Sequence, residues 1–483
     1  MAAKNVMQFL DLPRQDPKKA PVEIRLHDFR EIYGQFKSDQ AASQAGRCLD
    51  CGNPYCEWKC PVHNFIPNWL KLIQEGNLFA AAELSHQTNS LPEICGRICP
   101  QDRLCEGNCV IEQSGHGTVT IGAVERYLTD KAWEMGWVKP LRAGRARGQS
   151  VGVIGAGPAG LAAAERLREL GYEVTVYDRH DRPGGLMIYG IPSFKLEKDV
   201  VQRRTSRLAE GGIALVQGFE VGREATLGAL RETHDALLIA TGVYKARDLP
   251  CPGAGSGGVV AALDYLIASN RKGLGDAVAE FDSGELDAAG KRVVVVGGGD
   301  TAMDCVRTAV RQGAASVTCL YRRDKENMPG SAREVAHAEE EGVVFEWLAA
   351  PRAILGDAQR VTGVRTIRMR LGAPDSDGRQ APVEVEGGDF DLPCDLVIKA
   401  LGFDPEDVPN LFGEPALEVS RWGTVKANLK TMMTNLPGVF AAGDIVRGAS
   451  LVVWAIRDGR DASDNIHSYL KTKAETPALI AAE

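Results

Sequence analysis

The N-terminal part of the chain is rich in side chains that can bind metal. Eight of the twelve cysteines lie before residue 110, in two blocks. In sequence order these blocks are Cys48-x2-Cys51-x4-Cys56-x3-Cys60-Pro61 and Cys95-x3-Cys99-x5-Cys105-x3-Cys109. Three closely spaced cysteines with a fourth before proline are typical of ferredoxins, in which thiolates from short loops hold iron–sulfur clusters. The spacing predicts two 4Fe-4S clusters that exchange ligands between the blocks.

Disulfides and structural zinc are the alternatives. Disulfides need an oxidising compartment, but residues 1–30 contain no apolar stretch of the signal-peptide kind. Zinc sites usually combine two Cys-x2-4-Cys pairs, and only Cys48 and Cys51 have the commonest two-residue gap. Clusters are therefore the favoured interpretation, zinc remains the second, and a cytoplasmic location is expected.

The composition limits what the rest of the chain can be. Its 483 residues suffice for about three domains, and 44% hydrophobic with 25% charged residues is typical of a soluble globular protein. The apolar run 151–164 is broken by four glycines and a proline and is too short to cross a membrane. A net charge of −8 argues against broad nucleic-acid binding. The basic stretch 139–148 is expected to link two domains.

A glycine-rich turn follows this stretch. The motif Gly155-Ala-Gly157-Pro-Ala-Gly160 comes after an apolar strand and before an Ala-rich helix, and the next strand ends at Asp178. In such a turn the first glycine allows the bend, the second lets a pyrophosphate approach the backbone, and the third allows close helix packing. An acid at the end of the next strand can bind a ribose diol. The motif predicts a dinucleotide with an unphosphorylated ribose.

A second turn of this kind differs at the end of its second strand. Its sequence is Gly297-Gly-Gly299-Asp300-Thr301-Ala302, where Ala302 replaces the third glycine, a permitted variant. The following strand ends with Arg322 and Arg323 and carries no carboxylate there. Guanidinium groups can pair with the 2′-phosphate of NADP, which a carboxylate would repel. The second turn therefore predicts an NADPH site; the alternative is that both arginines are solvated surface charges.

Three further motifs resemble those of the flavin domain in two-dinucleotide pyridine-nucleotide oxidoreductases. They are Arg182-Pro-Gly184-Gly185-Leu186, Leu238-Ile-Ala240-Thr241-Gly242 and Val439-Phe-Ala-Ala-Gly443-Asp444. The resemblance implies that FAD binds the first turn, with Gly185, Thr241, Gly443 and Asp444 nearby. It also implies that the helix after Gly448 directs its N-terminus at the flavin ring, where it would stabilise negative charge. The redox-active cysteine pair of the disulfide reductases is missing, since Cys251, Cys305, Cys319 and Cys394 are scattered singly.

Over its full length the chain is similar to the small (beta) subunit of bacterial NADPH-dependent glutamate synthase. The same order occurs in the N-terminal part of dihydropyrimidine dehydrogenase and in ferredoxin:NADP transhydrogenase flavin subunits. The resemblance implies an α/β fold with two Rossmann-like domains, one inserted in the other, after a mainly helical iron–sulfur domain. The expected boundaries are 1–147 for two 4Fe-4S clusters, 148–287 and 416–483 for FAD, and 288–415 for NADPH.

The resemblance also assigns the cluster ligands by position. One cluster would be held by Cys48, Cys51, Cys56 and Cys109. The other would be held by Cys60, Cys99, Cys105 and a fourth ligand, for which Glu125 is expected and Cys95 is the alternative. A carboxylate is a harder ligand than a thiolate and would alter the potential of the cluster.

The expected activity follows from this resemblance. Hydride passes from NADPH to FAD, and single electrons then leave through the clusters, so no side chain is predicted to act as acid, base or nucleophile. The chain lacks the length for a synthase barrel. A large (alpha) partner subunit with FMN would make glutamate from glutamine and 2-oxoglutarate, in ammonia assimilation. Alternatives are an electron-bifurcating transhydrogenase subunit, an input subunit of a pyrimidine reductase and, more distantly, a cluster scaffold without enzymatic activity.

Overall fold

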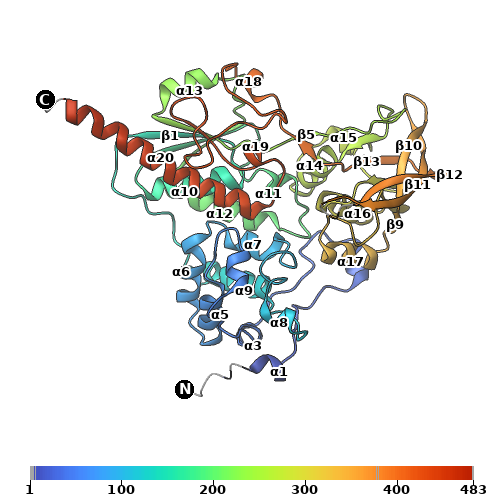
Figure 1. The fold of residues 1–483 in the computed structure, drawn as a ribbon, viewed down its shortest axis with the longest axis horizontal. Coiled ribbons are helices and arrows are strands. Elements are labelled where there is room, and N and C mark those ends of the chain that lie inside the picture. The colour runs from blue at the N-terminus through green and yellow to red at the C-terminus, as the bar shows by residue number, and fades with distance from the viewer. Residues whose placement is uncertain (1–4, 6, 377, 379, 481–483) are drawn as a thin grey trace.

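The computed structural model describes residues 5, 7–376, 378 and 380–480. Figure 1 shows a helical domain in blue at the bottom, beneath two α/β regions. The chain enters the upper left region, crosses to the right one and returns to the left one to end in a long helix. Among the described residues, no helix is long and apolar enough to cross a membrane.

The helical domain, residues 7–137, carries both cysteine blocks. Its helices are α1 (Gln8–Asp11), α2 (Val22–Arg25), α3 (Ser38–Ala45), α4 (Tyr55–Lys59), α5 (Ile66–Gln74), α6 (Leu78–Thr88), α7 (Pro92–Ile98), α8 (Val110–Gln113) and α9 (Ile121–Glu134). Helix α5 buries Trp69 and Leu70 on one face, which gives it an apolar stripe toward the core shared with α9. The cysteines lie on the short helices and loops around this core.

The first nucleotide domain, residues 150–246 and 403–480, is built on a parallel sheet in the order β15-β4-β1-β2-β3. Its strands are β1 (Ser150–Ile154), β2 (Glu173–Asp178), β3 (Ala214–Gln217), β4 (Ala236–Ile239) and β15 (Val439–Ala441). Its helices are α10 (Pro158–Glu169), α11 (Leu186–Tyr189), α12 (Lys198–Glu210), α13 (Leu227–Thr233), α18 (Val408–Leu411), α19 (Asp444–Arg447) and α20 (Val452–Ile480). Strand β4 is buried throughout, as expected for a parallel strand covered on both faces.

The second nucleotide domain, residues 247–402, contains a parallel sheet in the order β6-β13-β7-β8-β9. Its strands are β6 (Val259–Ala261), β7 (Arg292–Val296), β8 (Ser316–Tyr321), β9 (Val344–Trp347) and β13 (Leu396–Lys399). Its helices are α14 (Ala262–Gly273), α15 (Ala279–Asp282), α16 (Asp300–Arg311) and α17 (Ala332–Glu340). An antiparallel sheet of β10 (Ala349–Gly356), β11 (Val361–Pro374) and β12 (Gln380–Pro393) packs beside it.

The second nucleotide domain, which is inserted in the first, begins and ends earlier than the predicted boundaries 288 and 415. Strand β6 pairs with β13, so residues before 288 already belong to the second sheet. Residues 408–417 pack instead in the core of the first domain. The two crossing segments pair with each other as β5 (Lys245–Ala246) and β14 (Phe403–Asp404). Strands this short leave little periodicity in the sequence, which explains the displaced boundaries.

An N-terminal excursion connects the helical domain to the second nucleotide domain. We call residues 18–34 the clasp: its two arms pair through Lys19 and Tyr33, and its tip lies on α17. Arg25, which is 3% exposed, forms ion pairs with Glu340 at 2.8 Å and Glu341 at 3.4 Å. Buried charges need such partners, so the clasp holds the second domain in a defined position.

A second buried ion pair joins the helical domain to the first nucleotide domain. Both guanidinium contacts from Arg204 on α12 to the carboxylate of Glu93 on α7 measure 2.7 Å, and both side chains are fully buried. Burial alone would raise the pKa of Glu93, but Arg204 outweighs it and lowers this pKa to about 2. Glu93 therefore stays ionised and paired at neutral pH.

Replacing Glu93 tests this interface. We expect Glu93→Ala to lower the free energy of unfolding by ~3–5 kcal/mol, because the substitution leaves the Arg204 charge buried without a partner. The matched control is Glu384→Ala, which breaks an exposed pair with Arg352 at 2.7 Å and should change stability by less than ~1 kcal/mol. Thermal unfolding of both variants is the measurement, and equal midpoints would contradict the interpretation.

Candidate cofactor sites

The first glycine turn is shaped to admit a ligand at one position only. A Cβ at Gly155, whose φ is +110°, would lie 2.4 Å from the Ala240 carbonyl oxygen, and one at Gly160 would lie 1.9 Å from the Gly155 oxygen. A Cβ at Gly157 would meet nothing within 4 Å. The outer glycines therefore allow the turn and the helix packing, while Gly157 leaves open space at the N-terminus of α10, where a pyrophosphate binds in such folds.

A trough runs along the carboxyl ends of β1, β2 and β4. It consists of two hollows of about 100 and 60 Å³ that share Gly155, Asp178, Thr241 and Tyr244. The Asp178 carboxylate accepts hydrogen bonds from the backbone N–H groups of Ala156 and His180, at 2.7 and 2.8 Å. These bonds fix the acid at the ribose end of the trough. The predicted residues Gly155, Gly157, Asp178, Thr241 and Asp444 thus line one continuous site.

Two buried side-chain oxygens in this trough have no hydrogen-bond partner among the described residues. Thr241 Oγ1 and Asp444 Oδ1 accept or donate no hydrogen bond to any described residue. Burial raises the pKa of Asp444 to about 6. Gly443 and Gly185, with φ of +78° and +54°, position the turns beside them. Orphaned polar groups are costly in a protein interior, so the trough fits a hydroxyl-rich ligand such as FAD.

Helix α20 closes one end of the trough, as its resemblance to a flavin domain implied. Ser450, Leu451 and Val452 at its start line the same hollow as Gly157. The helix then runs along α10 (Figure 1), and a Cβ at Gly459 would lie 2.1 Å from the Ala159 carbonyl oxygen. Glycine is required at this close approach, which fixes the N-terminus of α20 against the trough.

The second glycine turn opens into a larger cavity of about 670 Å³. Its lining includes Gly297, Gly299, Thr301, Arg322 and Arg323. A Cβ at Gly299 would meet nothing within 4 Å, and Arg323 Nε is buried without a hydrogen-bond partner among the described residues. The predicted contrast between the two turns therefore has a structural counterpart, because basic groups stand where the first site has Asp178.

Two residues predicted for the second site serve the fold around it. Asp300 Oδ1 accepts a hydrogen bond from the Ser331 backbone N–H at 2.8 Å, which ties the start of α16 to the loop before α17. Ala302 is fully buried and permits close packing, as a glycine would. Neither side chain belongs to the cavity lining, so both position the turn rather than face its ligand.

The structure brings Cys48, Cys51, Cys56 and Cys109 around one cavity of about 20 Å³. Asp50, between the first two, has a φ of +57°, which an aspartate tolerates and which wraps the loop back. Burial and the neighbouring thiols raise the pKa of Cys56 to about 12. Burial thus disfavours the Cys56 thiolate that a cluster needs, and the positive charge of cluster iron would offset this cost.

The second cysteine group offers five candidate ligands for the four ligand positions of one cluster. They are Cys60, Cys95, Cys99, Cys105 and Glu125. Burial raises the pKa of Cys60 to about 12 and, with Cys95 nearby, that of Glu125 well above its usual range. Cys99 hydrogen bonds to Cys95, which raises its pKa further. In the described part of the chain, no three His, Cys, Asp or Glu side chains are arranged to hold a metal ion as they stand. The choice between Cys95 and Glu125 therefore remains a prediction.

The remaining cysteines lie away from the trough. Cys305, Cys319 and Cys394 are fully buried in the second nucleotide domain, and Cys251 packs beside them. The first three are core residues, and Cys251 is partly buried where it lines the second cavity.

Comparison with known proteins identifies both parts of the chain. Residues 25–137 match the dihydropyrimidine dehydrogenase domain II, 4Fe-4S cluster family, and residues 149–459 match the pyridine nucleotide-disulphide oxidoreductase family. The chain is 63% identical to the glutamate synthase [NADPH] small chain of Azospirillum brasilense over 100% of both chains. It is 50% identical to that of Escherichia coli strain K12, over 97% of this chain and 100% of the relative. The chain belongs to the NADPH-dependent glutamate synthase small chain family.

A solved structure supports the fold of this family member. FprA of Mycobacterium tuberculosis in complex with NADPH is 21% identical, with a TM-score of 0.58 over 68% of this chain and 86% of that one. The small-chain family and its two domain families make the protein an oxidoreductase with FAD, NADPH and 4Fe-4S clusters as cofactors. The predicted fold class and the predicted kinds of cofactor are confirmed, whereas the number of clusters stays a prediction.

Two contacts in this small chain escaped the sequence analysis. Tyr244 lines both hollows of the trough, and Arg179 lies 4.7 Å from its ring centre. Arg457 on α20 donates a hydrogen bond to the Pro61 carbonyl oxygen at 2.9 Å, beside Cys60. The sequence offers no spacing signal for either residue, because both depend on contacts between distant segments.

The open glycines give a matched test of the two nucleotide sites. We expect Gly157→Ala to fold but to retain much less FAD, because the new methyl group occupies space meant for the pyrophosphate. Gly299→Ala should retain FAD and raise the KM for NADPH at least tenfold. A tenfold change corresponds to about 1.4 kcal/mol of binding free energy. Bound flavin absorbance and steady-state kinetics measure these effects. Gly160→Ala, which collides with backbone, is expected to misfold; normal FAD content in Gly157→Ala would contradict the assignment.

Proposed function

We propose that the protein is the electron-input subunit of a glutamate synthase. In this proposal it oxidises NADPH at the second nucleotide domain and delivers electrons through the first domain to the cysteine groups. The supporting observation is that α20 touches both the trough at Val452 and the Cys60–Pro61 turn through Arg457. One rigid helix thus connects the flavin site to a cluster site.

The residues of the second site select and hold NADPH. Arg322 and Arg323 stand where the 2′-phosphate would lie, and Gly299 leaves room for the pyrophosphate at the start of α16. Lys195 from the first domain pairs with Asp304 on α16 at 2.7 Å, so the two nucleotide domains are fixed beside each other. FAD, when bound, supplies the chemistry that converts a two-electron donor into single electrons.

In this proposal, electrons that leave the trough reach the two cysteine groups one after the other. Helix rise places Arg457 roughly 8 Å along α20 from Val452. Cys60, Cys95 and Cys99 pack in or against the apolar core of the first nucleotide domain, whereas Cys48, Cys56 and Cys109 pack only in the core of the helical domain. The Cys60 group is therefore the first acceptor, and the Cys48 group lies farther out. Burial raises the pKa of Cys60, and hydrogen bonds from the backbone N–H groups of Asn64 and Val62 to its sulfur oppose part of this rise.

The proposed partner is a large subunit that contains FMN and makes glutamate from glutamine and 2-oxoglutarate, in a hetero-oligomer. Relatives that are 63% and 50% identical carry the name of a small chain of this enzyme, which supports a larger companion. Among the alternatives, the match to a domain of dihydropyrimidine dehydrogenase favours a pyrimidine-reducing partner as the second candidate. Consumption of NADPH that depends on uracil would identify that partner.

The fourth ligand of the Cys60 cluster can be decided by counting iron. We expect Glu125→Ala to lose this cluster and Cys95→Ala to retain both. Removing Glu125 takes away an acid that is 9% exposed and stands among the other ligands. Iron analysis and electron paramagnetic resonance of the two variants are the measurements, with Glu112→Ala as an exposed control nearby. A full complement of clusters in Glu125→Ala would reject the carboxylate ligand.

The proposed division of labour predicts two different activities. The purified chain should oxidise NADPH with ferricyanide as acceptor but form no glutamate from glutamine and 2-oxoglutarate. Addition of the large subunit should restore glutamate formation, and Cys48→Ser should abolish this restored activity while leaving NADPH oxidation through the flavin. Glutamate formation by the chain alone would contradict the proposal.

A further inference from the structure

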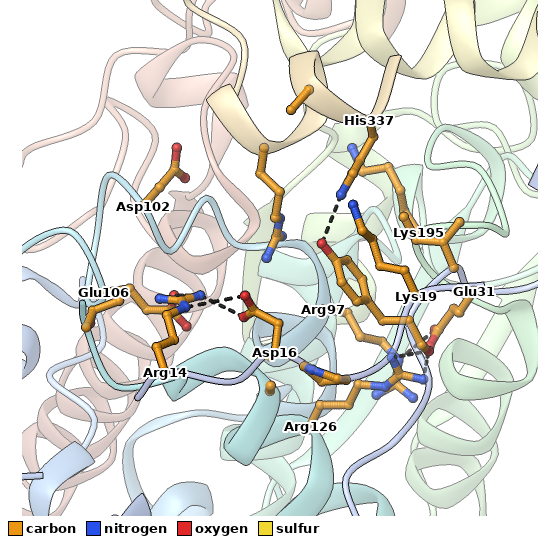
Figure 2. A pocket seen from close by; sticks show the side chains of 18 of the residues that line it. Arg14, Asp16, Lys19, Glu31, Arg97, Asp102, Glu106, Arg126, Lys195 and His337 are labelled. Carbon is orange, nitrogen blue, oxygen red and sulfur yellow. Dashed lines mark hydrogen bonds and ion pairs between the residues drawn. The ribbon is translucent and has the colours of Figure 1, made fainter. Parts of the chain in front are cut away.

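We propose that the junction of the three domains holds a binding site for a small zwitterion of the amino-acid class. A cavity of about 580 Å³ lies there, between the clasp, the helical domain and α17. Figure 2 shows charged side chains from all three sides around it, including Asp102, Lys19 and His337. Pockets of ~300–1,000 Å³ at domain interfaces are the usual sites of small ligands. No residue of either glycine turn lines this one.

The lining of this cavity carries equal numbers of basic and acidic side chains. Most of them neutralise each other within the wall. Arg14 pairs with Asp16 at 2.9 Å and with Glu106 at 3.0 Å, and Lys19 pairs with Glu340 at 2.7 Å. A wall balanced in this way offers little to a ligand with one sign of charge. A ligand with both signs matches it better.

Two opposite charges in the wall have no close ionic partner among the described residues. The carboxylate nearest to Arg333 is that of Glu334, at 3.9 Å, and Arg307 already holds it at 2.6 Å. Arg333 Nε is buried and forms no hydrogen bond within the described part of the chain. Within the described part of the chain, the Asp102 carboxylate accepts one hydrogen bond, from the Ser331 hydroxyl at 3.4 Å. A carboxylate bound to Arg333 and an ammonium bound to Asp102 would satisfy both.

These two charges belong to different domains. Asp102 lies in the helical domain and Arg333 on α17 of the second nucleotide domain, so one occupant would bridge them. The bridge would act on the NADPH site, because Ser331 donates its backbone N–H to Asp300 at 2.8 Å and Gly330 donates to the Gly298 oxygen at 2.9 Å. A ligand bound here would therefore restrain the loop that supports the second glycine turn, and it would change the apparent affinity for NADPH.

Calorimetry on the full chain with its cofactors tests the site, with L-glutamine as the probe. Two analogues each lack one charged group: glutaramate has no ammonium, and 4-aminobutanamide has no carboxylate and is one carbon shorter. We expect L-glutamine to bind and each analogue to bind at least tenfold more weakly. Glutaramate binding as tightly as L-glutamine, or no heat with L-glutamine, would overturn the proposal.

Variants connect this binding to the named residues. Arg333→Gln and Asp102→Asn should each weaken L-glutamine binding at least tenfold, whereas Arg103→Gln, a neighbouring exposed arginine outside the lining, should not. With ferricyanide as acceptor, L-glutamine should shift the KM for NADPH at least twofold in the parent chain and not in Arg333→Gln. An unchanged KM in the parent chain would overturn the coupling to the NADPH site. This readout needs no large subunit.

Discussion

The proposed electron path out of the flavin site depends on how helix α20 packs between two domains. Its first turn closes the flavin trough, Gly459 lets it approach the backbone of α10, and Arg457 binds the Cys60–Pro61 turn. Arg460 adds hydrogen bonds to Ser90 and to the Gln87 carbonyl. A helix held at so many points moves little, so packing rather than a flexible linker fixes the separation between the trough and the Cys60–Pro61 turn.

Burial disfavours the charged form of two classes of group in this protein, but only one class finds its counter-charge within the chain. Glu93 and Arg204 are buried together and keep their charges because each compensates the other. The thiols of Cys56 and Cys60 are crowded near other thiols, and burial disfavours their ionised form. Cluster assembly supplies the missing positive charge. The helical domain therefore has its stability linked to metal, whereas its contact with the flavin domain is held by the protein alone.

The sequence predicts local chemistry better than long-range architecture. The glycine turns follow from local spacing, and family resemblance predicts a ligand set around Cys48 whose four thiols lie around one cavity. The boundaries of the inserted domain were displaced because β6 and the β5–β14 pair are too short for a periodic signal. The clasp and the contact of Arg457 depend on segments that meet only in three dimensions. Ser331 is a further example, since its bond to Asp300 follows from no motif.

The clasp has a consequence for how the chain is made. Lys19 and Arg25 find their carboxylate partners at Glu340 and Glu341, more than three hundred residues later. A ribosome releases the N-terminus first, so the helical domain must wait for most of the chain before this part of its surface is covered. Contacts of such long sequence separation form late and slowly. During that interval the clasp has no partner on α17, and the cavity at the junction of the three domains is incomplete.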